Sequence, residues 1–106
     1  MIMIVSTTET IPDKEIKEVV GICRGSTVRA RNFGRDILAG FKNLVGGEID
    51  GYTKLQAESR EQALQRMIQD AENLGADAVV NIRFTTSTIM QGASEILAYG
   101  TAVKLG

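Results

Sequence analysis

The sequence predicts a two-layer α/β (α+β) fold, in which a small antiparallel sheet carries two helices on one face. Short segments rich in β-branched residues occur near both ends of the chain, and such segments are typical of strands. Two longer segments between them repeat apolar residues at helical spacing. A length of 106 residues suits one domain, residues 1–106, and leaves no room for a second.

Two strands are expected in the N-terminal third. Residues 1–5 form a short apolar run, and a polar connector follows it. Residues 15–26 show partial alternation, and this strand is expected to continue toward Arg29. The side chains expected on one face of this strand are small and mostly apolar: Val19, Gly21 and Cys23.

Two further strands are expected in the C-terminal third. Residues 78–85 are predicted to form a strand in which Val80, Ile82 and Phe84 share one face. Residues 86–92 then form either a polar turn or a continuing strand edge. Residues 94–105 form the last strand, and both of its faces carry apolar side chains: Leu97, Tyr99 and Val103 on one, Ile96, Ala98 and Ala102 on the other.

The two helices lie between these strands. Asn32 can cap a helix whose apolar stripe runs from Phe33 to Val45 before two glycines end it. A second helix, at residues 50–74, is expected to end at Gly75 and to run past the sheet edge or against a neighbour. Its predicted buried side consists of Tyr52, Leu55, Ala63, Leu64, Met67, Ile68, Ala71 and Leu74.

Composition excludes several classes of function. Twelve basic and 13 acidic residues give a net charge of −1, which argues against a nucleic-acid binder that works by neutralising phosphates. The chain has no histidine and one cysteine, so it can form neither a Ser-His-Asp site nor an internal disulfide. No apolar run is long enough to span a membrane, and a free thiol suits a reducing compartment. We therefore expect a cytoplasmic protein that is not an enzyme.

The apolar residues on both sides of the last strand predict an oligomer. Helices that belong to a single crossover can cover only one face of a small sheet. The other face therefore needs a different cover, since monomers rarely leave large apolar patches exposed. A second copy of the same chain is the simplest cover.

Several segments together resemble the YbjQ-like family of small bacterial proteins, and the resemblance covers nearly the whole chain. It is carried by Asp36–Gly47, Tyr52–Leu55, Arg60–Met67, Leu74–Val80 and Ala98–Val103. The resemblance implies a dodecin-like subunit that assembles into a ring-shaped homopentamer. It also implies binding of a soft heavy-metal ion, because the family carries a heavy-metal-binding label.

Cys23 is the candidate metal ligand, because a thiolate is a soft donor and a ring would bring several copies together. The alternative is that Cys23 is a small buried side chain in a strand, as free cysteines usually are. The lack of histidine and of a second cysteine does not fit what a metal site normally requires.

A cluster of arginines suggests a different binding function: Arg24, Arg29, Arg31 and Arg35 fall within twelve residues. They approach the start of the first predicted helix, where free amides and the helix dipole favour an anion such as a phosphate-bearing metabolite or a short stretch of nucleic acid. Arg29, Arg31 and Arg35 are the expected ligands. The alternative is a solvated charged loop, which is the more common explanation for clustered charges.

Overall fold

The structure is a computed structural model that describes residues 2–30 and 50–106. The side chains of Ala30 and of residues 50–55 are not part of this description. The first predicted helix, Phe33 to Val45, lies outside the described residues.

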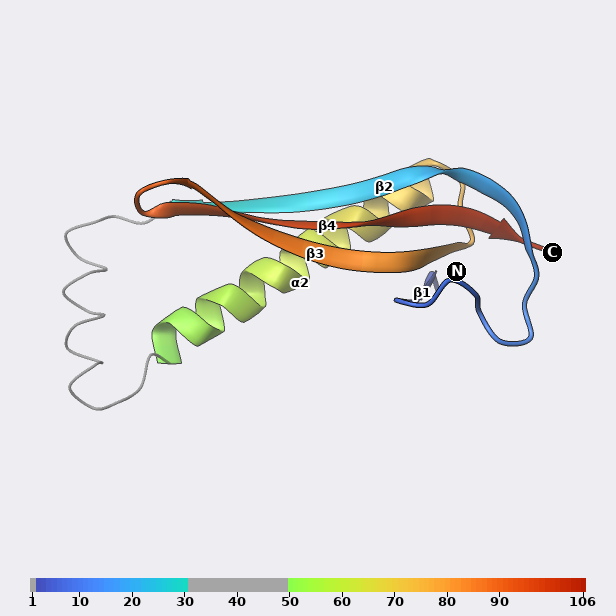
Figure 1. Ribbon diagram of the computed structural model, residues 1–106, viewed down its shortest axis with the longest axis horizontal. Helices are drawn as coiled ribbons and strands as arrows, with labels where there is room; N and C mark the ends of the chain where they lie inside the picture. The colour runs from blue at the N-terminus through green and yellow to red at the C-terminus, as the bar shows by residue number, and fades with distance from the viewer. Residues whose placement is uncertain (1, 31–49) are drawn as a thin grey trace.

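A four-stranded sheet and one long helix, α2 (Asp50–Asn73), make up the described fold (Figure 1). The strands are β1 (Ile4–Val5), β2 (Ile16–Ala30), β3 (Ala78–Met90) and β4 (Ala93–Leu105), and their order across the sheet is β1-β3-β4-β2. This confirms the two-layer α+β prediction. The sheet is mixed and not wholly antiparallel, because β1 pairs in parallel with β3 while β2 and β3 pair antiparallel with β4.

Helix α2 covers one face of the sheet, where it packs mainly on β2 and β4 (Figure 1). Its buried side carries Ala63, Met67 and Ala71, as the helical spacing predicts. Twenty-four residues give a helix of about 36 Å, and Figure 1 shows its first turns extending away from the sheet. Leu74 was expected to be buried but is 40% exposed, because the helix ends before it.

The end of α2 has a specific hydrogen-bond pattern. Gly75 adopts a positive φ of 80°, and its amide donates to the Glu72 carbonyl. The Ala76 amide donates to the Ala71 carbonyl. These two bonds form a Schellman motif, which satisfies helix carbonyls that would otherwise lack partners. Gly75 therefore ends the helix as predicted.

A β-bulge in β2 changes which side chains share a face. Val19 pairs with Val103, whereas Gly21 pairs with Ala102, so the register shifts between them. Val19 consequently points away from α2 and is 65% exposed, while Cys23 lies under the helix with no exposed surface. The prediction that Val19, Gly21 and Cys23 share one face was therefore wrong for Val19.

A second bulge, in β3, has the same effect. Val80 pairs with Thr101 and Arg83 with Tyr99, so two β3 residues lie opposite Gly100 alone. Asn81 occupies the left-handed region with φ of 56°, which asparagine tolerates better than most residues. Ile82 therefore joins the core beneath α2 and Val80 packs on the other side, so their predicted common face was wrong.

The N-terminal segment covers part of the second sheet face, which the sequence did not predict. Ile4, Ile11 and Ile16 pack against a small cluster on that face, made of Ala78, Val80 and Val103, with Leu105 beside it. The remainder, called here the open face, still exposes Val19, Ile22, Val28 and Tyr99.

The end of β3 extends beyond this cover. The eight residues Arg83–Met90, called here the β3 arm, are all exposed. Strand β3 therefore continues to Met90, which confirms the continuing-edge alternative for this segment. In the part of the chain that the structure describes, no helix is both long and apolar enough to cross a membrane.

Candidate functional site

Cys23 lies in the core between β2 and α2. Its side chain has no exposed surface, and its thiol donates a hydrogen bond to the Gly100 carbonyl at 3.6 Å. Burial, followed by the nearby Asp70 carboxylate, raises the pKa of the Cys23 thiol above its ordinary value. The protonated thiol is therefore favoured, whereas metals bind the thiolate.

We expect Cys23 to react with a disulfide reagent such as Ellman's reagent at least about a thousandfold more slowly in the folded protein than in denaturant. The thiol becomes accessible only when the chain opens, and global opening of a domain is unfavourable by about 5 kcal/mol or more. A control with Cys23→Ser and Gln65→Cys, which places a thiol on the exposed side of α2, should react immediately. Comparable rates for the two proteins would contradict the burial.

The raised pKa also predicts a direction for the dependence of stability on pH. The unfolded chain releases the thiol proton near pH 9.0, before the folded chain does. The contribution of Cys23 to stability is therefore complete below pH 9.0 and is lost as the pH rises through the folded pKa.

Arg29 is held by the helix rather than free to bind an anion. Its Nε donates to Ser59 Oγ at 3.1 Å, and its Nη2 donates to Gln62 Oε1 at 2.9 Å. Ser59 is itself buried on α2. Arg31 and Arg35 lie outside the described residues. The anion site that was expected at the start of the first predicted helix therefore stays a prediction.

The β3 bulge produces a shallow hollow of about 360 Å³ on the open face. It is lined by Ile22, Asn81, Arg83, Tyr99, Gly100 and Thr101. A Cβ at Gly100 would lie 2.6 Å from Val79 Cγ1, which belongs to the core beneath α2. A larger residue at this position would therefore press on that core.

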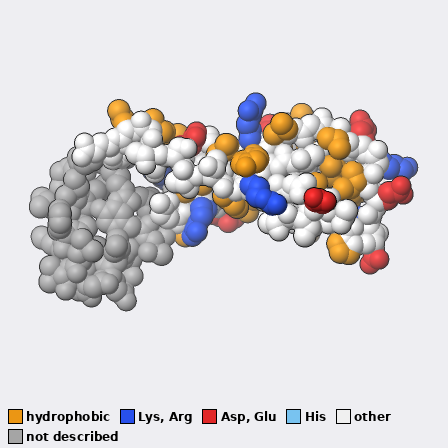
Figure 2. All heavy atoms as spheres, in the orientation of Figure 1, with side chains coloured by type: hydrophobic (Ala, Val, Ile, Leu, Met, Phe, Trp, Pro, Cys, Tyr) orange, Lys and Arg blue, Asp and Glu red, His pale blue; other side chains and the backbone are white. Residues whose placement is uncertain are grey.

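Two arginines flank the aromatic ring at this hollow. Tyr99 pairs with Arg24 of β2 on one side and with Arg83 of β3 on the other, so all three lie in one row of the open face. Figure 2 shows basic side chains on either side of hydrophobic ones near the middle of the molecule. Sequence reasoning missed this row, because Arg24 and Arg83 are 59 positions apart and only the strand register brings them together.

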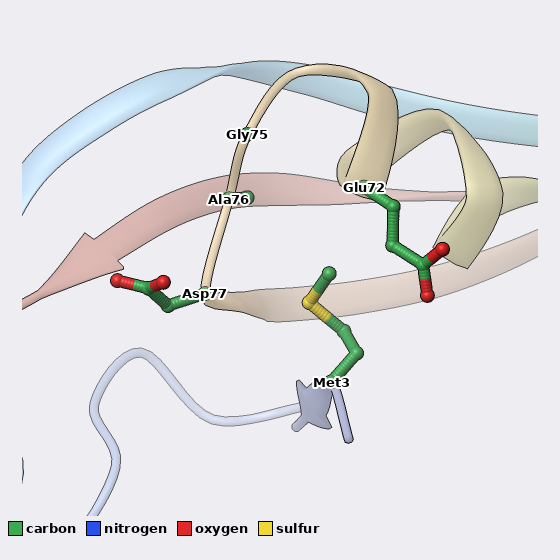
Figure 3. A pocket seen from close by; sticks show the side chains of 5 residues that line it. All are labelled: Met3, Glu72, Gly75, Ala76 and Asp77. Carbon is green, nitrogen blue, oxygen red and sulfur yellow. The ribbon is translucent and has the colours of Figure 1, made fainter. Parts of the chain in front are cut away.

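A second hollow of about 300 Å³ lies where the N-terminal segment meets the end of α2. Figure 3 shows the Met3 side chain rising between the carboxylates of Glu72 and Asp77. Asp77 Oδ2 accepts a hydrogen bond from the Leu105 amide at 2.9 Å, so this carboxylate supports the end of β4. A single thioether and one remaining carboxylate are too few donors for a metal site.

Comparison with known sequences identifies the family. The profile of the YbjQ family, described as "Putative heavy-metal-binding", matches residues 3–106. The chain belongs to this family.

Relatives of the YbjQ type are close and widespread. A UPF0145 protein of Vibrio campbellii is 62% identical over 103 residues, covering 97% of this chain and 99% of the relative. A UPF0145 protein of Archaeoglobus fulgidus is 59% identical, covering 97% and 95% of the two chains. Because this relative is archaeal, the expectation of a purely bacterial family was too narrow.

A solved structure supports the fold of this YbjQ-family chain. The chain resembles a protein of unknown function of the DUF74 family from Pediococcus pentosaceus, with a TM-score of 0.67 and 17% identity. The likeness covers 98% of both chains. At this identity it establishes the fold alone.

The described residues do not form the metal site that the YbjQ description suggests. Among the described side chains, those of residues 2–29 and 56–106, no three of His, Cys, Asp or Glu gather around one point. Cys23 is the one thiol of the chain, and its side chain has no exposed surface. Binding of a metal by Cys23 stays a prediction.

Proposed function

We propose that this protein is a non-enzymatic binding or scaffold protein of the cytoplasm, and that it assembles from identical subunits through the β3 arm. The family resemblance suggests a closed ring of five. The observation that carries the proposal is the unprotected strand edge of the arm, considered together with its apolar side chains.

Within residues 2–30 and 50–106, the edge of the β3 arm has no protection against pairing. Strand β1 pairs only with Ala78 and Val79, and the N-terminal segment adds bonds to the amides of Asn81 and Ile82. In the described part of the chain, nothing pairs with β3 beyond that point on the side away from β4. Residues 84–90 contain neither a charged residue nor a proline, which are the usual means of blocking an exposed edge.

The β2 edge, at the other end of the sheet, is protected by α2. Asp70 Oδ2 accepts a hydrogen bond from the Arg24 amide at 3.0 Å, and Arg66 Nη1 donates to the Ser26 carbonyl at 2.6 Å. Side chains therefore bind two backbone groups that a partner strand would need. The contrast between the two edges favours the arm as the site of association.

Exposed apolar residues and an extended shape also support association at the arm. Phe84, Ile89 and Met90 are 46%, 55% and 64% exposed. The radius of gyration is 17.3 Å, whereas a compact domain of this length has about 13 Å. A protruding strand with apolar side chains is more stable when a second copy covers it.

We expect Ile89→Lys to dissociate the assembly. A lysine adds charge to the edge and blocks strand pairing, and loss of an interface anchor costs about 2 kcal/mol or more per contact. Val19→Lys is the matched control, because Val19 is similarly exposed but lies at the far end of the open face. Size-exclusion chromatography at micromolar concentration should give an earlier elution for the wild type and the control than for Ile89→Lys. Identical elution of all three proteins would contradict assembly through the arm.

A further inference from the structure

We propose that the hollow on the open face binds a planar aromatic molecule that carries an anionic group. Ile22 and Tyr99 provide its apolar surface, and Arg83 lines it on one side of Tyr99. Arg24, which pairs with Tyr99 on the other side, adds positive charge next to the hollow. The inference rests on the proposed binding role but not on assembly through the β3 arm.

The apolar part of the hollow suits a flat ring. Tyr99 is 39% exposed and Ile22 is 72% exposed, although both are large hydrophobic side chains. Ile22 pairs with Thr101, and Arg24, the next residue on this face of β2, pairs with Tyr99. Aromatic faces stack on tyrosine rings, so a planar ligand would cover both exposed side chains.

The positive charge is not neutralised locally. No ion pair links Arg24 or Arg83 to an acidic side chain among residues 2–30 and 56–106, and the one acidic side chain that bonds near Arg24 binds its backbone amide. Arg83 Nη1 donates to the carbonyls of Thr7 at 3.0 Å and Ile82 at 2.8 Å. These bonds fix the Arg83 guanidinium beside the hollow and leave other N–H donors for an anion.

The size of the hollow sets the class of ligand. A volume of about 360 Å³ lies at the lower end of the range of small-molecule sites. A single aromatic unit with one phosphate or carboxylate fits this space, whereas a dinucleotide does not. Both anionic groups accept hydrogen bonds from arginine, so a nucleoside monophosphate and an aromatic carboxylate are the two sources to compare.

The test is a calorimetric titration of the full chain with adenosine monophosphate and, separately, with 1-naphthoate. Two further probes separate the contributions: adenosine has the aromatic ring without the anionic group, and inorganic phosphate has the charge without the ring. We expect at least one of the two aromatic anions to bind about tenfold or more tightly than adenosine and phosphate. Tighter binding of the nucleotide indicates a phosphate-bearing ligand, and tighter binding of naphthoate indicates a carboxylate.

Variants locate the binding in the hollow. Arg24→Gln and Arg83→Gln should each weaken the tighter aromatic anion about tenfold, and Tyr99→Leu should weaken it by a similar factor. Arg60→Gln, an exposed arginine on α2, is the matched control and should bind like the wild type. Arg24 makes no side-chain hydrogen bond in the described structure, so its variant remains informative if Arg83→Gln does not fold.

Two outcomes would overturn the inference. One is no binding of either aromatic anion up to about 10 mM. The other is binding that Arg24→Gln, Arg83→Gln and Tyr99→Leu leave unchanged. Ile89→Lys should retain binding even when it dissociates the assembly. Failure of the ligand site and failure of the assembly are therefore distinguishable.

Discussion

Gly25→Ala is expected to lower the free energy of unfolding by about 3 kcal/mol. Gly25 lies in β2 and faces the backbone of α2. A Cβ there would lie 2.5 Å from the Ala63 carbonyl oxygen and 2.6 Å from the Arg66 carbonyl carbon, and nearer still to the Met67 amide nitrogen.

The reason for the large effect is that all three atoms belong to the helix backbone. A flexible side chain could move aside at small cost, but here the whole helix must shift away from the sheet. That shift would also loosen the contacts of Ala63 and Met67, which have no exposed surface. Overpacking usually costs 1–3 kcal/mol in proteins, and a backbone clash belongs at the upper end of that range.

Urea unfolding at one fixed protein concentration measures this effect. Ser26→Ala is the control, because the neighbouring side chain faces the other side of the sheet. Its free energy of unfolding should stay within about 0.5 kcal/mol of the wild type. If Gly25→Ala unfolds at the same urea concentration as the control, then α2 does not lie on β2 as described.

Met67→Ala is expected to lower the free energy of unfolding by about 3 kcal/mol. Met67 is the largest side chain in the core with no exposed surface, and it lies among Cys23, Ala98 and the other residues beneath α2. Truncation removes the transfer free energy of the buried atoms and leaves a cavity, which together cost 2–5 kcal/mol for methionine in other cores.

Gln65→Ala provides the comparison for Met67→Ala. It shortens an exposed side chain on the opposite side of the same helix, so the helix propensity changes little and no cavity forms. We expect a change within about 0.5 kcal/mol. Thermal and urea unfolding should rank the two variants in the same order, and an equal effect for both would show that Met67 does not lie in the core.

Much of the fold can be predicted from residue patterns alone. The 3.6-residue spacing of Ala63, Met67 and Ala71 identified the buried side of α2, and Gly75 identified its end. The alternation along β4 identified a strand with two apolar faces. These features are local, so neighbouring residues carry enough information to specify them.

The bulges could not be predicted, because each depends on a partner strand. Strict alternation placed Val19 with Cys23 and Val80 with Ile82, whereas an extra residue in each strand reverses the faces. Asn81 is one weak local signal, since asparagine accepts a positive φ. Its partner Gly100 is 19 positions away, and only the register reveals that the two lie opposite each other.

The candidate site was harder to predict than the fold. The cluster at Arg29, Arg31 and Arg35 was chosen for its closeness in sequence, but Arg29 hydrogen-bonds to Ser59 and Gln62 on α2. The row that includes Arg24 and Arg83 is assembled by strand pairing and has no sequence motif. The anion site at Arg29, Arg31 and Arg35 stays a prediction, because Arg31 and Arg35 lie outside the described residues.

Multi-angle light scattering of the unmodified protein at micromolar concentration measures the mass of the particle in solution. Assembly through the β3 arm predicts a mass that is a multiple of 11.5 kDa, and five times that value for the ring. A particle of 11.5 kDa would contradict it, because the β3 arm would then be exposed to solvent without a second copy to cover it.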